Sequence, residues 1–444
     1  MNPSVPKLFG PDRTYERWRW QIFALTWLAY AGFYLTRKSF AIAKIALEKP
    51  DVLGLTKHQM SWIDGGFLTA YAVGMVLWGV CGDRFGTRKV IIGGMIGSIL
   101  AAFAMGASST VALLMLFFTA QGIFQSTGWA PLSKNVTNFF SRRERGVVMG
   151  LWCTNYAVGG LVGGIYAGQI GERFGWRASF YIPALTLGLV LILFLLFQRN
   201  RPEDVGLPAI EVYHSETTST LLPETAPATI PAQPSLPEQK DGAWATILHV
   251  IADPMVLLLS LIYFCLKPAR YAILLWGPKY INESIGSGMS ESGLISAMFE
   301  LAGPVSVIVA GFVSDKIFGS RRMPVSVICL FLLGIVLFTL DHLPHNRWML
   351  GGGLFLIGFL TYAPDSLISG TAAVDFGTKK GASTASGLVN GAGSVGAIVG
   401  GTLPGFFHQQ WGWQGVFTFL AGSVFLAALL LLPKWNALPG QGRG

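Results

Sequence analysis

Residues 79–89 read GVCGDRFGTRK, and a related stretch, GFVSDKIFGSRR, occupies residues 311–322. Both stretches follow an apolar run and end in basic residues. Other matches between the two parts of the chain keep almost the same spacing: GWRASF at Gly175 with GWQGVF at Gly412, Arg145-Gly146 with Lys380-Gly381, and Arg37 with Arg270. These separations are all roughly 232–237 residues, a period that indicates one duplicated unit.

The composition indicates that this duplicated unit lies in a membrane. Hydrophobic residues make up 52% of the 444-residue chain and charged residues only 12%, which is about half the charged share of a soluble globular protein. Apolar runs of about 20 residues, long enough to cross the hydrocarbon core, recur along nearly the whole chain. We therefore expect a polytopic membrane protein, with the lipid bilayer as its main surrounding.

We predict an all-α membrane protein with twelve membrane-spanning helices in two pseudo-symmetric six-helix halves. The spans lie near residues 20–42, 58–80, 90–108, 110–137, 147–168, 177–197, 250–278, 290–313, 323–340, 348–370, 383–406 and 414–433. Parallel halves related by an axis along the membrane normal are typical of major facilitator transporters, in which the substrate site lies between the halves.

The predicted domains follow from these spans. They are a cytoplasmic N-terminal segment (1–19), an N-terminal six-helix bundle (20–198), a cytoplasmic linker (199–247), a C-terminal six-helix bundle (248–433) and a cytoplasmic tail (434–444). The linker is rich in Pro, Thr, Ser and Glu, a composition that favours disorder over part of its length.

The net charge of +9 reflects membrane topology and does not indicate nucleic acid. Basic residues concentrate in loops that we predict to be cytoplasmic, such as Arg142, Arg143 and Arg145. Both termini are then cytoplasmic, and the expected location is the plasma membrane, or the inner membrane in a bacterium. The first apolar run begins near Gln21 and has no cleavage site behind it, so we expect a retained helix.

The sequence shows no sign of an enzyme, a metal site or a cofactor. The cysteines are single, which indicates neither a disulfide framework nor a zinc site: Cys81, Cys153, Cys265 and Cys329. No nucleophile–base set or phosphate-binding glycine loop is visible.

The repeated loop motif is a candidate gating element. Gly79 and Gly82 permit close helix contact, and Asp83 can pair with a cation or a helix N-terminus and so stabilise one state of a gate. The candidate gating residues are Gly79, Asp83, Arg84, Gly86, Arg88 and Asp315. The alternative is that the motif only sets topology, with its basic residues inside and a glycine in the turn.

Charged residues inside the predicted spans are the best candidates for substrate binding, since each is costly in a bilayer. Arg37 and Lys38 lie in the first span, and Arg37 follows Tyr34 by about one helical turn. A guanidinium can bind two oxygens of an anion at once. Alternatively, Arg37 extends to the outer headgroups.

The seventh span carries Lys267 and Arg270, which share a helix face, and Pro268 between them can kink or break the helix. With one arginine from each half, Arg37 and Arg270 could bind an anion between them. The competing account pairs Lys267 and Arg270 with the carboxylate of Glu300.

Further residues complete the predicted site. Asp64 could neutralise Arg37 or Lys38 in the empty state, and its alternative role is helix packing. The charge-coupling candidates are Glu300, Asp64 and Asp365. The substrate-binding candidates are Arg37, Arg270, Lys267, Tyr34, Lys38, Tyr156, Tyr271, Trp129, Tyr71 and Asn155. Each aromatic residue among them could instead serve only in packing.

Over nearly its full length the chain resembles the organophosphate:phosphate antiporters of the major facilitator superfamily. The resemblance rests on YAGFYLTRKSFAIA, GWAPLSKNVTNFFSRRERGVVMGLW, ARYAILLWGPKY, FELAGPVSVIVAGFVSDKIF and RPEDVGLP. It implies a monomeric exchanger of a small phosphorylated metabolite for inorganic phosphate by alternating access, in which Arg37 and Arg270 bind the phosphate and Glu300 matches a family glutamate.

The chain departs from the glycerol-phosphate and hexose-phosphate carriers at three positions. Met75 stands where these have a lysine, Tyr156 where they have a histidine and Leu275 where they have an aspartate. Several stretches look more like the sugar-phosphate exchanger branch. Two other functions stay open: a membrane sugar-phosphate sensor that signals to a partner kinase, and a proton-coupled organic anion symporter.

Overall fold

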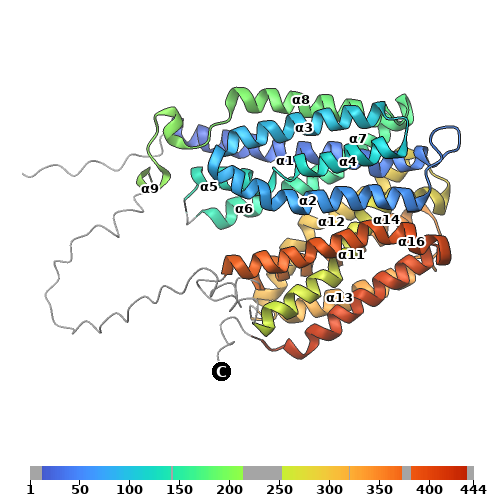
Figure 1. The fold of residues 1–444 in the computed structure, drawn as a ribbon. Helices are drawn as coiled ribbons and strands as arrows, with labels where there is room; N and C mark the ends of the chain where they lie inside the picture. Colours follow the sequence, from blue (N-terminus) through green and yellow to red (C-terminus); the bar gives the residue numbers. More distant parts are fainter. Residues whose placement is uncertain (1–12, 142–143, 214–252, 320, 373–381, 438–444) are drawn as a thin grey trace, which may run out of the picture.

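The computed structural model describes residues 13–141, 144–213, 253–319, 321–372 and 382–437, and every regular element in these ranges is a helix. Figure 1 shows two bundles side by side, the N-terminal half in blue to green and the C-terminal half in yellow to red. The predicted all-α fold with two halves is confirmed.

The N-terminal half comprises helices α1 to α8, because two of its six predicted spans are divided. The fourth predicted span becomes α4 and α5, separated by a turn at residues 126–128, and the fifth becomes α6 and α7, which meet at Cys153. The bounds are α1 Arg13–Leu47, α2 Lys57–Phe85, α3 Thr87–Ala107, α4 Val111–Gln125, α5 Trp129–Phe139, α6 Arg145–Trp152, α7 Thr154–Phe174 and α8 Ala178–Phe197.

The C-terminal half comprises α11 to α16. The bounds are α11 Pro254–Ile285, α12 Met289–Lys316, α13 Arg322–Leu340, α14 Arg347–Ser366, the π-helical turn η3 Leu367–Ala372 and α16 Ala382–Leu431. Within α16, Gly412 adopts φ 60° and ψ −165°, so this stretch contains two helices that meet at a kink. These are the eleventh and twelfth predicted spans.

Ten helical stretches among the described residues are long and apolar enough to cross a membrane. This number counts α16 once and leaves out α1, which is less apolar because it carries Arg37, Lys38 and Lys44. With α1 added and α16 divided at Gly412, the chain has the twelve spans of the major facilitator fold.

Local sequence determines where several helices begin. Thr56 and Gln59 form a capping box at the start of α2, and the Asp253 carboxylate accepts from two backbone N–H groups at the start of α11. α11 then continues through both Pro268 and Pro278. Of the two predicted effects of Pro268, a kink or a break, the break does not occur.

The main contacts between the two halves join α7 with α12, α2 with α16, and α1 with both α11 and α12. Glycines bring these backbones close together. A Cβ atom added at Gly293 of α12 would lie 2.6 Å from the carbonyl oxygen of Gly164 on α7, and one at Gly405 of α16 would lie 2.4 Å from that of Lys57. Small residues therefore permit this close approach.

The segments outside the bundles are described in part. The linker predicted at 199–247 is described as far as Tyr213 and contains a short turn, η1 (Pro202–Val205), and α9 (Ile210–Tyr213). The ring of Tyr213 stacks on that of Tyr15, with 3.9 Å between centroids. Residues 214–247 of the predicted linker, 1–12 of the predicted N-terminal segment and 438–444 of the predicted tail lie outside the described ranges.

Candidate functional site

Arg37 lies on α1 where the two halves meet, and its side chain is buried, with only 4% of the residue exposed. The guanidinium carbon is 4.4 Å from the ring centroid of Tyr34 and 4.7 Å from that of Tyr71. Arg37 Nε donates to Gln125 Oε1 at 2.9 Å, whereas its Nη2 is buried and has no hydrogen-bond partner among the described residues. The alternative in which Arg37 extends to the headgroups is therefore wrong, and an orphaned cationic donor is a suitable partner for an anion.

Arg270 occupies the equivalent place on α11 and differs from Arg37 in having a carboxylate partner. Its Nη1 donates to Asp365 Oδ2 at 2.6 Å, and Lys267 Nζ lies 3.0 Å from the other oxygen of the same carboxylate. The competing account, in which Glu300 supplies this carboxylate, is wrong. Asp365, near the end of α14, neutralises part of the repulsion between two cations that share a helix face.

Glu300 on α12 instead pairs across the interface with Lys38 on α1. The Lys38 Nζ to Glu300 Oε1 distance is 3.0 Å, and the Tyr362 hydroxyl donates to Glu300 Oε2 at 2.6 Å. Lys38 Nζ also donates to the carbonyl of Leu274 at 3.3 Å. Pro278 has no N–H and leaves that carbonyl without its helical donor, so Lys38 satisfies an acceptor that the proline exposes.

Asp64 pairs with Lys44, and neither side chain has any exposed surface. The expectation that Asp64 neutralises Arg37 or Lys38 is therefore wrong. Lys44 Nζ also donates to the carbonyl of Leu275 at 3.1 Å and lies 3.9 Å from the ring centroid of Trp276, both on α11 of the other half. Sequence reasoning missed Lys44 because it follows the predicted end of the first span, although α1 runs on to Leu47.

Tyrosines surround both arginines. The rings of Tyr156 and Tyr362 stack with 6.2 Å between centroids, and the Arg270 guanidinium lies 5.5 Å from the first and 4.6 Å from the second. Lys267 Nζ lies 5.7 Å from the ring of Tyr271. The structure thus brings the predicted tyrosines of the two halves to the charged residues.

Trp129 and Asn155 are the two remaining substrate-binding candidates. Trp129 packs 6.4 Å from the Tyr156 ring and also against Tyr30 and Trp152, so its described contacts are aromatic packing. Asn155 on α7 is fully buried, and neither atom of its amide has a hydrogen-bond partner in the described part of the chain.

The predicted gating motif is described in part. The structure describes the side chains of Arg84, Arg88 and Asp315 and gives Gly86 a φ of 85°, but the surroundings of Gly79 and the Asp83 side chain lie outside the description. Arg88 Nη2 donates to the carbonyl of Leu195 at 2.5 Å, and Asp315 pairs with Arg322 at 2.6 Å. Both of these contacts lie within one half, and the gating role stays a prediction.

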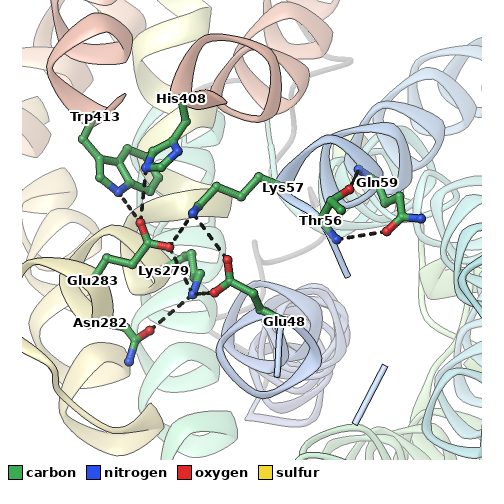
Figure 2. A network of polar contacts seen from close by, with 9 residues as sticks. All are labelled: Glu48, Thr56, Lys57, Gln59, Lys279, Asn282, Glu283, His408 and Trp413. Carbon is green, nitrogen blue, oxygen red and sulfur yellow. Dashed lines mark hydrogen bonds and ion pairs between the residues drawn. The ribbon is translucent and has the colours of Figure 1, made fainter. Parts of the chain in front are cut away.

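A second charged cluster, which we call the outer network, was missed in the sequence because its members are far apart along the chain. It consists of Glu48, Lys57, Lys279, Glu283 and His408 (Figure 2). Lys57 Nζ lies 2.8 Å from Glu283, Lys279 pairs with Glu48, and His408 Nε2 lies 3.3 Å from Glu283. The N-terminal half contributes Glu48 and Lys57, and the C-terminal half contributes Lys279 and Glu283. The ammonium group of each half therefore pairs with a carboxylate of the other half.

This chain is similar to known proteins in both sequence and fold. A family model described as the Major Facilitator Superfamily matches residues 23–381 and 259–441. The chain belongs to the Major Facilitator Superfamily. Members of this superfamily are membrane transporters, so the chain is a multi-pass transporter and not an enzyme, as the sequence predicted.

Within the Major Facilitator Superfamily, the relatives narrow the assignment. The chain is 32% identical to a probable hexose phosphate transport protein of Chlamydia muridarum, covering 98% of this chain and 94% of the relative. It is 29% identical to the glycerol-3-phosphate transporter of Bacillus subtilis (96% and 94% covered) and 31% identical to the membrane sensor protein UhpC of Escherichia coli (98% and 96% covered). The predicted membership of the organophosphate:phosphate antiporter family is confirmed.

A solved structure supports the Major Facilitator Superfamily fold. The chain matches a bacterial homologue of the human lysosomal transporter Spinster, in an inward-facing and unoccupied conformation, with a TM-score of 0.71. The match covers 94% of this chain and 95% of that chain at 15% identity. At this identity the likeness concerns the fold alone.

Proposed function

We propose that this chain exchanges a small organophosphate, such as a sugar phosphate or a similar phosphate ester, for inorganic phosphate by alternating access. The observation that carries the proposal is the buried Arg37, whose Nη2 has no hydrogen-bond partner in the described ranges. It occupies the place in the N-terminal half that corresponds to Arg270 in the C-terminal half. The relatives named for hexose phosphate and glycerol 3-phosphate support a phosphorylated substrate.

The charges at the interface fit a dianion. The inner cluster, which we define as Arg37, Lys38, Lys267, Arg270, Glu300 and Asp365, contains four basic and two acidic side chains. A phosphate ester carries a charge of about −1.5 to −2 at pH 7. A bound phosphate would neutralise the cluster, whereas the empty carrier keeps excess positive charge in a low-dielectric interior, where moving it is unfavourable. This difference favours exchange over net transport.

Substrate binding would also change the partner of Arg270. The buried Nε of its guanidinium has no hydrogen-bond partner in the part of the chain that the structure describes, and one carboxylate, Asp365, pairs with both Arg270 and Lys267. An incoming phosphate could bind Arg270 while Lys267 keeps Asp365 charged and paired. Both cations would then have a partner in the loaded state.

Counterflow in liposomes tests the proposed function. Purified protein in liposomes loaded with phosphate should take up labelled phosphate or a labelled sugar phosphate, and liposomes without internal phosphate should take up little. The homology with a membrane sensor supplies a second candidate: a sensor would bind the sugar phosphate without exchange. Uptake that collapses with an uncoupler would instead favour a proton-coupled symporter.

The contacts between the halves support an inward-facing state. In the described ranges they run from the outer network to the stacked rings of Tyr156 and Tyr362. On the side of the gating loops, Arg88 and Asp315 contact their own half. Opening to the outside would then require the ion pairs of the outer network that cross the interface to separate.

The double substitution Lys57→Ala/Lys279→Ala should favour the outward-facing state by roughly tenfold, since it removes the two ammonium groups through which the outer network crosses the interface. A cysteine at Thr402, which packs against Gly65 at the interface of α2 and α16, reports the change. Its labelling from outside by a membrane-impermeant maleimide should accelerate in a background without the native cysteines. The control is Lys49→Ala, a substitution of an exposed lysine in the loop between α1 and α2. Equal labelling rates in all variants would show that the outer network does not close this side.

Location and assembly complete the proposal. We infer a monomer in the plasma membrane, or in the inner membrane of a bacterium, with both termini in the cytoplasm. The basic loops next to the gating motif support this orientation. Protease protection of tags on both termini, in sealed vesicles of known orientation, measures it.

A further inference from the structure

Gln125 accepts a hydrogen bond from the Arg37 guanidinium at 2.9 Å, and it was not among the residues predicted from the sequence. We propose that Gln125 is a positioning residue that orients the Arg37 guanidinium toward the phosphate. This inference rests on the proposed function, because it assigns the support of the same site.

Hydrogen bonds at both ends determine how the Gln125 amide lies. Its Nε2 donates to the Thr36 hydroxyl at 2.9 Å and to the carbonyl of Phe33 at 3.2 Å, and the Thr36 hydroxyl in turn donates to that carbonyl at 3.1 Å. Its Oε1 accepts from Arg37 Nε at 2.9 Å. A flipped amide would place N–H against N–H and oxygen against carbonyl oxygen, so only one orientation satisfies every group.

The position of Gln125 in the fold explains why it can reach Arg37. It is the last residue of α4, immediately before the turn that separates α4 from α5, and it is fully buried against α1. Gly128 in this turn packs against Tyr30, where an added Cβ would lie 2.9 Å from the ring. The close contact of this turn with α1 brings the amide to the Arg37 side chain.

These contacts leave an N–H group of the Arg37 guanidinium available for an anion. Gln125 occupies Nε, and the rings of Tyr34 and Tyr71 lie 4.4 Å and 4.7 Å from the guanidinium carbon. Nη2 is left without a partner in the described structure, so it can donate to a phosphate oxygen. Because an amide is neutral, Arg37 keeps its full charge for the substrate, whereas Arg270 shares its charge with Asp365.

Gln121 provides a matched control. It lies one turn earlier on the same helix and is equally buried, but neither atom of its amide has a hydrogen-bond partner in the described structure. Gln125→Met and Gln121→Met therefore make the same chemical change at neighbouring buried positions. Only the first removes bonds to α1.

The experiment measures phosphate self-exchange in proteoliposomes and phosphate-induced thermal stabilisation of the purified protein. Gln125→Met should raise the KM for phosphate about tenfold, with a maximal rate close to that of the parent, while Gln121→Met changes neither. Gln125→Glu should weaken phosphate binding further than Gln125→Met does. It keeps an acceptor for Arg37 Nε but adds a negative charge beside the binding guanidinium.

Several outcomes would overturn the assignment. A Gln125→Met protein with the parental KM, or one that loses maximal rate and stability without a change in KM, would mean that Gln125 serves packing only. If Gln125→Met does not fold, Gln125→Glu decides, and parental affinity in that variant refutes the proposal. A parent protein that neither binds nor exchanges phosphate would instead refute the proposed function itself, together with this assignment.

Discussion

Replacement of Arg37 by alanine should lower phosphate self-exchange in proteoliposomes by at least about a hundredfold, because it removes a desolvated charge that would bind the anion directly. Arg37 is buried, bears no carboxylate partner in the described structure and has a free Nη2. No other described cation of the inner cluster combines these properties, since Lys38, Lys267 and Arg270 are all paired with carboxylates.

Two further variants separate charge from geometry at this position. Arg37→Lys keeps a positive charge but loses the bond to Gln125 and the second donor of the fork, so it should retain only part of the exchange rate. Arg347→Ala makes the same change as Arg37→Ala at a side chain that is 66% exposed at the start of α14, and it should leave exchange unchanged. If Arg37→Ala exchanges phosphate as fast as the parent, the proposed anion site is wrong.

Removal of one partner of the Lys44–Asp64 pair should lower the free energy of unfolding by about 3–5 kcal/mol. Both side chains are completely buried. Lys44→Met leaves the Asp64 carboxylate without its ammonium partner, and Asp64→Asn leaves the ammonium without its carboxylate. The midpoint temperature of thermal denaturation in detergent, followed by size-exclusion chromatography, reports this loss of stability.

The double replacement Lys44→Met/Asp64→Leu is the decisive comparison. It removes both charges and fills their volume with apolar atoms, so its stability should return close to that of the parent. The same double variant also lacks the bond from Lys44 to the carbonyl of Leu275 in the other half. Its equilibrium between inward-facing and outward-facing states can therefore be compared with that of the Lys57→Ala/Lys279→Ala protein. Single variants as stable as the parent would contradict the expected cost of a stranded buried charge.

Much of the fold could be predicted from the chain because its signals are local or repeated. Apolar runs of spanning length gave the helices, and the spacing between GVCGDRFGTRK and GFVSDKIFGSRR gave the duplication. The places of Arg37 and Arg270 in the two repeats indicated that the halves contribute matching cations. The turns that divide the fourth and fifth spans were not predicted, because each leaves an apolar run of the expected length.

The pairing of charges could not be predicted in the same way. Glu300 and Asp365 are both acidic residues within predicted spans, and the sequence suggested only Glu300 as a partner for Lys267 and Arg270. The structure assigns Glu300 to Lys38 and Asp365 to Arg270 and Lys267. These choices depend on how each helix is rotated about its axis and on its level relative to its neighbours, neither of which follows from periodicity within one helix.

The sequence by itself determined that this protein is a duplicated membrane transporter with one intramembrane arginine in each half. Only the tertiary structure decided that Arg37, unlike Arg270, has no carboxylate partner among the described residues, that Gln125 accepts a hydrogen bond from its Nε, and that Lys44 and Asp64 pair with each other. The physical reason is that a charged residue is costly in a membrane span, so its presence in an apolar run of the sequence already indicates a role. Which residue it pairs with depends on distances of a few ångströms between helices that are far apart in the chain.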